Sequence, residues 1–467
     1  MSGVRAALRV NGFRALLVAY AINRAGDAIG ALALAVVVLA ATHSALATAA
    51  LFLATQFLPG LIGPVFVARI DRCSPGRLLP PLLLVEGLLF VALAALVHHA
   101  GAAPIIALAF VDASLAFSAR TIIRAATATV LLPHGLMPEG KAAFNVALAA
   151  AMVAGPVIAG LLVALVGSPA ALLVDAGSFL LAGVLVRSAP GLRYAPEAQT
   201  PGESSRGRLA EGLRYVAGRP ALRALIAGEG LAFIFFYLVV PVTVVYATRT
   251  LHAGPGGYAA ILACWGVGIA IGSAIQVRLA RRVRSTMILV STAAVAVGYL
   301  GTAVAPTIVV AGAASVIGGI GNGTQWASVE TLLHRLVDEA FRARAAAVLE
   351  SLASLAPGVG ILLGGALTAM FSPRAAYLAA GAGLVVLVLY GALRGAWGAI
   401  ALGVAASEGS NPQGPEASLE PHAPLEPHAP LEPHAPLEPH APLEPHAPLE
   451  PHAPAGAVPQ PSAARVA

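Results

Sequence analysis

Residues 14–41 read RALLVAYAINRAGDAIGALALAVVVLAA, a run that is long and apolar enough to cross a bilayer as one helix. A helix needs roughly 20 mainly apolar residues to span about 30 Å of hydrocarbon. Three polar residues, Asn23, Arg24 and Asp27, stand near the middle of this run. Charged groups inside a span are costly, so this stretch predicts a membrane helix with a functional centre.

The rest of the chain has the same character. It has 467 residues, of which 58% are hydrophobic and 11% charged, too apolar for a soluble protein of this size. Backbone groups in lipid must be satisfied within their own segment, so we expect an all-α membrane protein. The twelve predicted spans lie at about 14–41, 45–68, 78–98, 102–122, 142–166, 169–187, 224–247, 256–277, 286–304, 307–331, 345–370 and 376–396.

The basic residues indicate the sidedness of the chain. Nearly all of the 28 Lys and Arg residues fall in alternate gaps between the spans, whereas the opposite gaps hold only Arg249 and Arg374. Cytoplasmic loops carry this excess of positive charge, so both termini and the central polar segment are predicted to be cytoplasmic. We therefore expect a multi-pass protein of the bacterial inner (plasma) membrane. The net charge of +6 follows from these loops and does not indicate a nucleic-acid partner.

An internal repeat predicts two halves of six helices. Residues 155–186 resemble residues 359–389, with Gly160 aligned to Gly364 and the Ser168-Pro169 pair to Ser372-Pro373. Similarity after six spans, in the same orientation, indicates parallel halves. The expected division is an N-terminal bundle at 1–190, a cytoplasmic linker at 191–222 with a short amphipathic helix near 206–215, a C-terminal bundle at 223–402, and a tail at 403–467.

The tail contains six LEPHAP copies, from Leu419 to Pro454. Two prolines in every six residues forbid helix and sheet, so we expect a disordered tail. Successive histidines in an extended polyproline chain lie about 19 Å apart, because the rise is roughly 3.1 Å per residue. Neighbouring histidines cannot share an ion in that geometry, and we expect neither a metal site nor a cofactor.

Several polar residues inside spans are candidates for binding substrate or protons. Arg24 and Asp27 are three residues apart and share one helix face, where they either line a wet cavity or form a self-neutralising structural pair. The other candidates are Asn23, Asp112, Glu229, Asn322, Gln325 and Trp326. Glu229 lies near the cytoplasmic face, where pairing with loop arginines is the alternative.

Two further stretches suggest conformational change. The loop GPVFVARIDRCSPGR, residues 63–77, can form a charge network in one state and break it in another. Its candidate residues are Gly63, Asp71, Arg72, Gly76 and Arg77. In AGPVIAG, residues 154–160, the small residues Gly155 and Gly160 and the proline Pro156 allow helices to approach closely and flex.

Together these features resemble the major facilitator superfamily, over roughly residues 9–396. Within it, VNGFRALLVAYAINRAGDAIG (10–30) and LLPHGLMPEGKAAFNVALAAAMVAGPVIAG (131–160) resemble the drug- and siderophore-exporter branch typified by macrolide and enterobactin exporters. The resemblance implies that Gly155, Pro156 and Gly160 mark export, and that Asp27 falls where exporters place a membrane-embedded acid. Arg24 departs from the small residue common there. Arg120 and Arg124 are predicted to lie too near the cytoplasmic end to supply the arginine motif of the fourth span.

We therefore expect a monomeric secondary transporter for proton-coupled efflux of small amphipathic molecules such as drugs, siderophores or natural products. Its partners would be the substrate, protons and the bilayer. One alternative is an importer or facilitator of a small metabolite with the same fold. Another is a non-transporting membrane sensor or scaffold that uses its tail to recruit a partner. An enzyme is not expected, because the sequence has no nucleophile–base pair or metal-ligand cluster at catalytic spacing.

Overall fold

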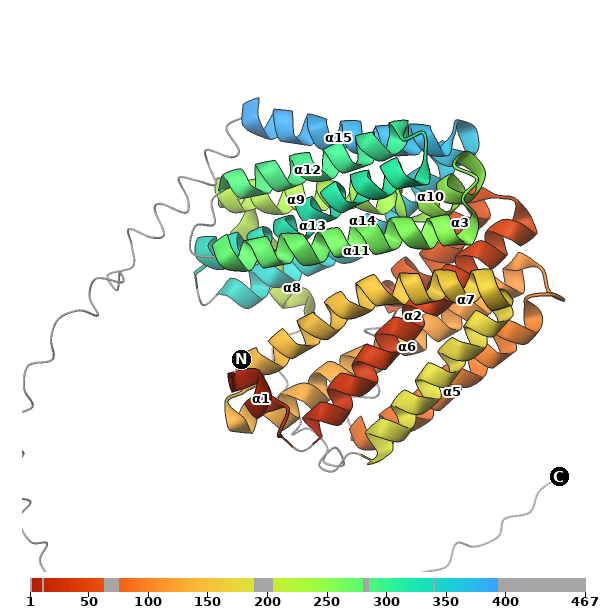
Figure 1. The fold of residues 1–467 in the computed structure, drawn as a ribbon. Helices are drawn as coiled ribbons and strands as arrows, with labels where there is room; N and C mark the ends of the chain where they lie inside the picture. The colour runs from red at the N-terminus through yellow and green to blue at the C-terminus, as the bar shows by residue number, and fades with distance from the viewer. Residues whose placement is uncertain are drawn as a thin grey trace, which may run out of the picture. The chain divides into compact units, whose positions relative to one another are not determined.

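The computed structural model describes residues 2–10, 12–62, 75–188, 205–279, 285–338 and 341–393. These residues belong to one compact unit, and their regular secondary structure is helical throughout (Figure 1). The predicted tail at 403–467 lies outside the described residues, as do Gly63, Asp71 and Arg72 of the predicted charge-network loop.

The helices follow one another in the order expected from the apolar runs. In the first half they are α1 (Ser2–Ala7), α2 (Phe13–Thr42), α3 (Ala45–Phe52) with the π-helical turn η1 (Leu53–Phe57), α5 (Pro75–Leu96), α6 (Ala102–Leu131) with the 3-10 turn η2 (Leu132–His134), and α7 (Met137–Ser188). In the second half they are α8 (Ser205–Ala217), α9 (Pro220–Leu238), α10 (Val240–Val245) with the π-helical turn η3 (Tyr246–Thr250), α11 (Gly254–Leu279), α12 (Ser285–Val304), α13 (Ile308–Leu336), α14 (Arg342–Met370) and α15 (Pro373–Leu393).

Ten of the described helical segments are long and apolar enough to cross a membrane. One of them, α7, has 52 residues and contains two predicted spans, separated at Gly167, whose φ of 85° is not helical. The polar residues Asn322 and Gln325 lower the hydropathy of α13, which is not among the ten. Counting α7 twice and adding α13, the described helices correspond to the twelve predicted spans.

Two predicted spans were wrong in detail. The fourth was expected to end near residue 122, but α6 continues to Leu131 because the residues after Arg124 remain apolar or carry threonines that bond to their own helix. The seventh was expected as one helix, but it is interrupted at Val239, where Pro241 has no N–H to continue the ladder of hydrogen bonds.

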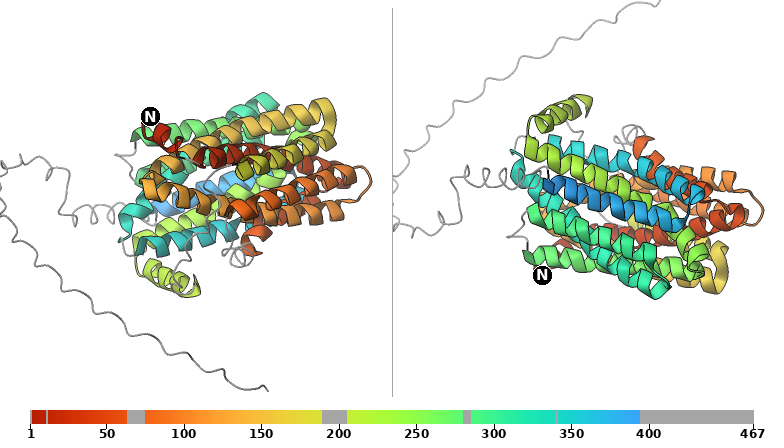
Figure 2. Two further views of the ribbon diagram at one scale, coloured as in Figure 1. Left: turned by 90° about the horizontal axis from the view of Figure 1, so that it is seen from below. Right: turned by 90° about the horizontal axis from the view of Figure 1, so that it is seen from above.

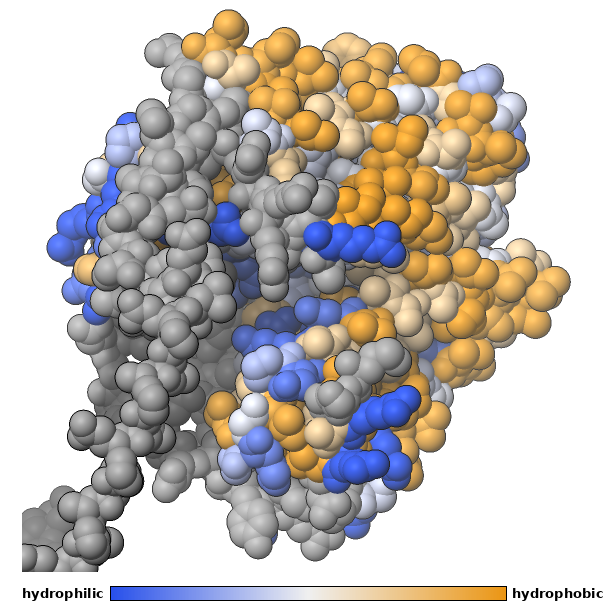
Figure 3. All heavy atoms as spheres, turned by 60° about the vertical axis from the view of Figure 1, so that its left-hand side comes forward, coloured by the Kyte–Doolittle hydropathy of each residue, from blue (hydrophilic) through white to orange (hydrophobic). Residues whose placement is uncertain are grey.

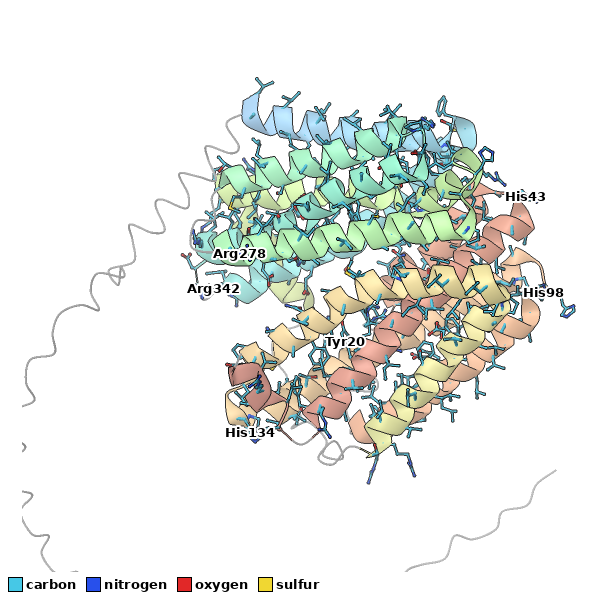
Figure 4. All side chains as sticks on the ribbon, in the orientation of Figure 1. Tyr20, His43, His98, His134, Arg278 and Arg342 are labelled. Carbon is cyan, nitrogen blue, oxygen red and sulfur yellow. The ribbon has the colours of Figure 1, made fainter. Side chains whose placement is uncertain are left out.

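Described residues that flank the basic gaps lie at one end of the helices. His134, Arg278 and Arg342 are at that end, and His43 and His98 are at the opposite end (Figure 4). In two further views, α1 and α8 also lie at the same end (Figure 2). The described residues beside the basic gaps and those beside the other gaps therefore lie at opposite ends of the helices.

The described sides of the helices expose many large apolar residues. Leu165, Val309 and Leu393 are among the most exposed, and Figure 3 shows hydrophobic residues spread over one such face. A soluble monomer rarely exposes apolar surface on this scale, so this surface suits contact with lipid.

The predicted amphipathic linker helix is present as α8. Its Glu211 bonds to Arg344 of α14, with 2.9 Å between Oε2 and Nε. The Tyr215 hydroxyl donates to Asp338 over 2.9 Å, and its ring stacks on Phe341. Burial raises the pKa of the Tyr215 hydroxyl. These contacts attach α8 to the end of the C-terminal bundle.

Glycines bring the two halves together along two seams. In the first, α7 meets α11, where Gly160 lies against Ala259, and a Cβ on Gly266 would come 2.6 Å from the Met152 carbonyl oxygen. In the second, α3 and η1 meet α14, where a Cβ on Gly358 would come 2.7 Å from the Phe57 ring. Small residues are what allow helix backbones to approach this closely in a membrane.

Replacing Gly160 by alanine tests the first seam. The new methyl group overlaps Ala259, so we expect a loss of about 1–3 kcal/mol of stability, typical of an overpacked contact. The melting temperature of the purified protein measures it. Gly177→Ala, in the part of α7 that follows Gly167, is the control, because a Cβ there meets nothing within 4 Å. Equal melting temperatures for the two variants would show that the seam is not tightly packed.

Candidate functional site

The centre of α2 holds a carboxylate that two arginines share. Asp27 Oδ2 accepts a hydrogen bond from Arg24 Nη1 at 2.9 Å, and Arg120 Nη1 of α6 lies 3.5 Å from the same oxygen. The side chain of Asp27 is 19% exposed, and both arginines are also partly exposed. Two guanidinium groups from two helices therefore offset the cost of placing this acid inside the bundle.

The position of Arg120 along its helix differs from the prediction. It was predicted near the cytoplasmic end of its span, but α6 extends well beyond it. The long helix places Arg120 beside Asp27, whereas Arg124, one turn further, is exposed. The local sequence could not show this pairing, because the partner lies on another helix.

Three more acids of the N-terminal bundle are buried near this pair. Asp112 of α6 was predicted as a site residue, whereas Glu86 of α5 and Asp175 of α7 were not. Their carboxyl groups interact electrostatically with Asp27, and those of Glu86 and Asp112 also with Arg120. Both oxygens of Glu86 and Oδ1 of Asp112 lack a hydrogen-bond partner among the described residues. In the sequence, the feature that could have identified these three residues is that each stands as a single acid inside an apolar run.

Glycines of α2 make room for Asp175. A Cβ on Gly26 or Gly30 would overlap its two carboxyl oxygens, one of which also accepts a hydrogen bond from the Ser178 hydroxyl at 3.0 Å. Asn23, one turn before Asp27, is buried, and its Nδ2 has no partner among the described residues. The polar face of α2 is thus turned toward the interior of the bundle.

The glycine-proline stretch of α7 packs against the same region. A Cβ on Gly155 would come 2.7 Å from the Cβ of Ala28, the residue after Asp27. Gly160 lies against Ala259 in the other half, and Pro156 stands inside the helix between them. This stretch of α7 therefore connects the helix that carries Asp27 with the C-terminal bundle.

A second polar pair lies in the C-terminal bundle. Gln325 Nε2 of α13 donates to Glu229 Oε2 of α9 over 2.9 Å, and both side chains are buried. No described arginine forms an ion pair with Glu229, contrary to the alternative of pairing with loop arginines. Trp326 is exposed and its ring centroid lies 5.7 Å from that of Phe233, while Asn322 is half-buried one turn earlier.

Of the predicted charge-network loop, only the last two candidates are described. Gly76 is the second residue of α5, and Arg77, which follows it, is exposed. The network itself stays a prediction.

Residues 225–427 match the family model described as Major Facilitator Superfamily. The structure is similar to that of the nucleoside transporter NupG, with a TM-score of 0.65, 11% identity, and coverage of 84% of this chain and 99% of that one. The chain therefore has the major facilitator fold. A bacterial homologue of the lysosomal transporter Spinster, in an inward-facing conformation, has a TM-score of 0.60 and 13% identity over 84% of this chain and 96% of its own.

A third similar structure is a bacterial homologue of the iron transporter ferroportin, also inward-facing, with a TM-score of 0.61 and 16% identity over 81% of this chain and 98% of that one. No curated protein matches the sequence. The proteins with these similar structures are transporters, and the likeness to them shows the fold of this chain.

Arg120→Ala tests the shared carboxylate. The change removes one of the two guanidinium groups beside Asp27, and we expect a loss of about 1 kcal/mol, the upper end of the range for partly exposed ion pairs. Thermal unfolding of the purified protein measures the loss. Arg124→Ala, one turn away on the exposed side of α6, should change the melting temperature little. If both variants behave alike, the pairing of Arg120 with Asp27 contributes nothing.

Proposed function

We propose that this major facilitator protein exports small amphipathic molecules in exchange for protons, by alternating access. The observation that carries the proposal is Asp27, a partly exposed acid inside a membrane helix, held by Arg24 and Arg120. Ionisable residues at such depth mark the paths of ions and substrates. Partial exposure means that water can reach this acid.

Protonation of Asp27 would change more than one contact. The proton removes the negative charge that both guanidinium groups share, leaving two like charges close together on α2 and α6. Like charges repel, and the repulsion is strong where the dielectric is low. A proton therefore favours a state in which the two helices are rearranged, which is the coupling that an antiporter needs.

The packing of α7 supports a route from this site to the other half. A shift of α2 acts directly on Gly155 through Ala28, and Gly160 contacts α11 about one and a half helical turns further along. We propose that Gly155, Pro156 and Gly160 form the hinge through which the state of Asp27 changes the first seam between the halves.

The seams also support an inward-open state. Their glycine contacts involve residues 152–160 of α7 and 256–266 of α11, away from the ends that lie near α8 (Figure 1). In the proposed orientation both termini are cytoplasmic, in a bacterial inner membrane, so the closed end faces outward. Inward-facing conformations are also those of the similar Spinster and ferroportin homologues. We propose that the protein works as a monomer.

Uptake of a metabolite is the second candidate function. It is favoured by the likeness to NupG, a nucleoside transporter, since the fold does not determine direction. Counterflow in oriented proteoliposomes, with candidate drugs, siderophores and nucleosides loaded on one side, separates export from uptake.

Asp27→Asn tests proton coupling. Asparagine keeps an oxygen that accepts from Arg24 but cannot gain or lose a proton, so the protein should fold while gradient-driven export is abolished. Export of a dye panel from energised inverted vesicles, with expression and melting temperature alongside, measures this. Unchanged export in the variant would remove Asp27 from the mechanism.

A further inference from the structure

Glu229 differs from Asp27 in lacking a positive partner. Glu229 is only 5% exposed, and its carboxylate accepts a hydrogen bond from the neutral side-chain amide of Gln325. Among the described residues no arginine, lysine or histidine forms an ion pair with it. An ionised carboxylate in a protein interior needs a compensating positive charge. Without such a partner, burial favours the neutral, protonated carboxyl of Glu229, and a bound cation would supply the charge that stabilises the ionised form.

Trp326, next to Gln325, is exposed on the side of α13 that contacts Phe233 of α9. It is 46% exposed, and Ile317, nine residues earlier on α13, is 45% exposed. Nine residues correspond to about two and a half helical turns, so the two side chains point to opposite sides of the helix. Ile317 continues the exposed apolar stripe that begins at Val309, which suits lipid. Trp326 is therefore exposed on the opposite side of α13, where its ring contacts Phe233 of α9.

Aromatic rings lie near the Glu229 carboxylate, on the side of α13 that contacts α9. Phe233 follows Glu229 by one turn on α9, so the Phe233–Trp326 contact and the Glu229–Gln325 hydrogen bond join the same two helices one residue apart on α13. The rings continue from Phe233 to Tyr237, with centroids 6.4 Å apart. Beyond it the ring contacts pass through Phe236, Trp265 and Tyr299. The face of an aromatic ring attracts a cation, and an adjacent carboxylate adds to that attraction.

We infer that Glu229, Gln325, Phe233 and Trp326 form a binding site for aromatic cations. The cationic group of the ligand lies at the Glu229 carboxylate, and its rings lie against Phe233 and Trp326. The inference names a substrate class for the proposed transporter and rests on that function. Binding itself requires no proton gradient, so it can be measured separately from coupling.

Equilibrium binding of tetraphenylphosphonium to the purified full-length protein tests the site. Two further probes separate charge from shape: tetraphenylborate has the same rings with a negative charge, and tetrabutylammonium has the positive charge without rings. We expect tetraphenylphosphonium to bind tightest of the three. Glu229→Gln should weaken its binding about tenfold or more, because the buried charge pair is lost. Trp326→Ala should weaken it about two- to fivefold, and Trp326→Phe less.

Matched variants keep the test decisive. Glu139→Gln removes one carboxylate charge at the start of α7 and should bind like the wild type. If Glu229→Gln fails to fold, Glu229→Asp and Trp326→Ala decide, since the first keeps the charge and should keep binding. The inference would be overturned if Glu229→Gln or Trp326→Ala bound tetraphenylphosphonium with wild-type affinity. It would also be overturned if tetraphenylborate competed equally for the site.

Asp27→Asn separates this inference from the proposed function. Its binding of tetraphenylphosphonium should still depend on Glu229 and Trp326 as in the wild type, because both of these residues lie in the other half. Normal binding together with proton-driven transport in Asp27→Asn would contradict the coupling proposal and leave the cation site standing. Transport that still depends on Asp27, with binding indifferent to Glu229, would contradict the cation site alone.

Discussion

The sharing of one carboxylate between two guanidinium groups is the constraint around which the N-terminal bundle is organised. Arg24 and Arg120 offset much of the cost of placing the partly exposed Asp27 in the middle of α2. The same need for compensation determines the position of α6, which must bring Arg120 to the level of Asp27. A change in the protonation of this single acid therefore alters contacts on two helices together.

Close glycine-mediated packing allows a change at Asp27 to affect helices that do not contact it. Gly26 and Gly30 bring α2 against Asp175 of α7, and Gly155 brings α7 against the residue that follows Asp27. Gly160 then brings α7 against α11 in the other half. In contacts without space for side chains, a displacement of one helix is passed to the next rather than absorbed.

The two halves differ in the chemistry that they place inside, although a sequence repeat relates them. The N-terminal bundle has Asp27 with two arginines beside it, while Glu229, the buried acid among the described residues of the C-terminal bundle, lies beside a neutral amide and a series of rings. This asymmetry suits a division of labour, with proton-dependent change in one half and ligand contact in the other. It agrees with a transporter in which cargo and proton need not share one group.

The sequence by itself predicted the helical class, the number of spans, a break between the spans at 142–166 and 169–187, and the two-bundle organisation, because hydropathy, charge and turn chemistry act locally. It also indicated Arg24 with Asp27, since three residues on one helix share a face. Only the tertiary structure decided that Arg120 belongs to this group, that Glu86 and Asp175 are buried beside it, and that Gln325 rather than an arginine meets Glu229. These partners come from different helices, and their meeting depends on helix length, rotation and packing, which no local pattern of residues encodes.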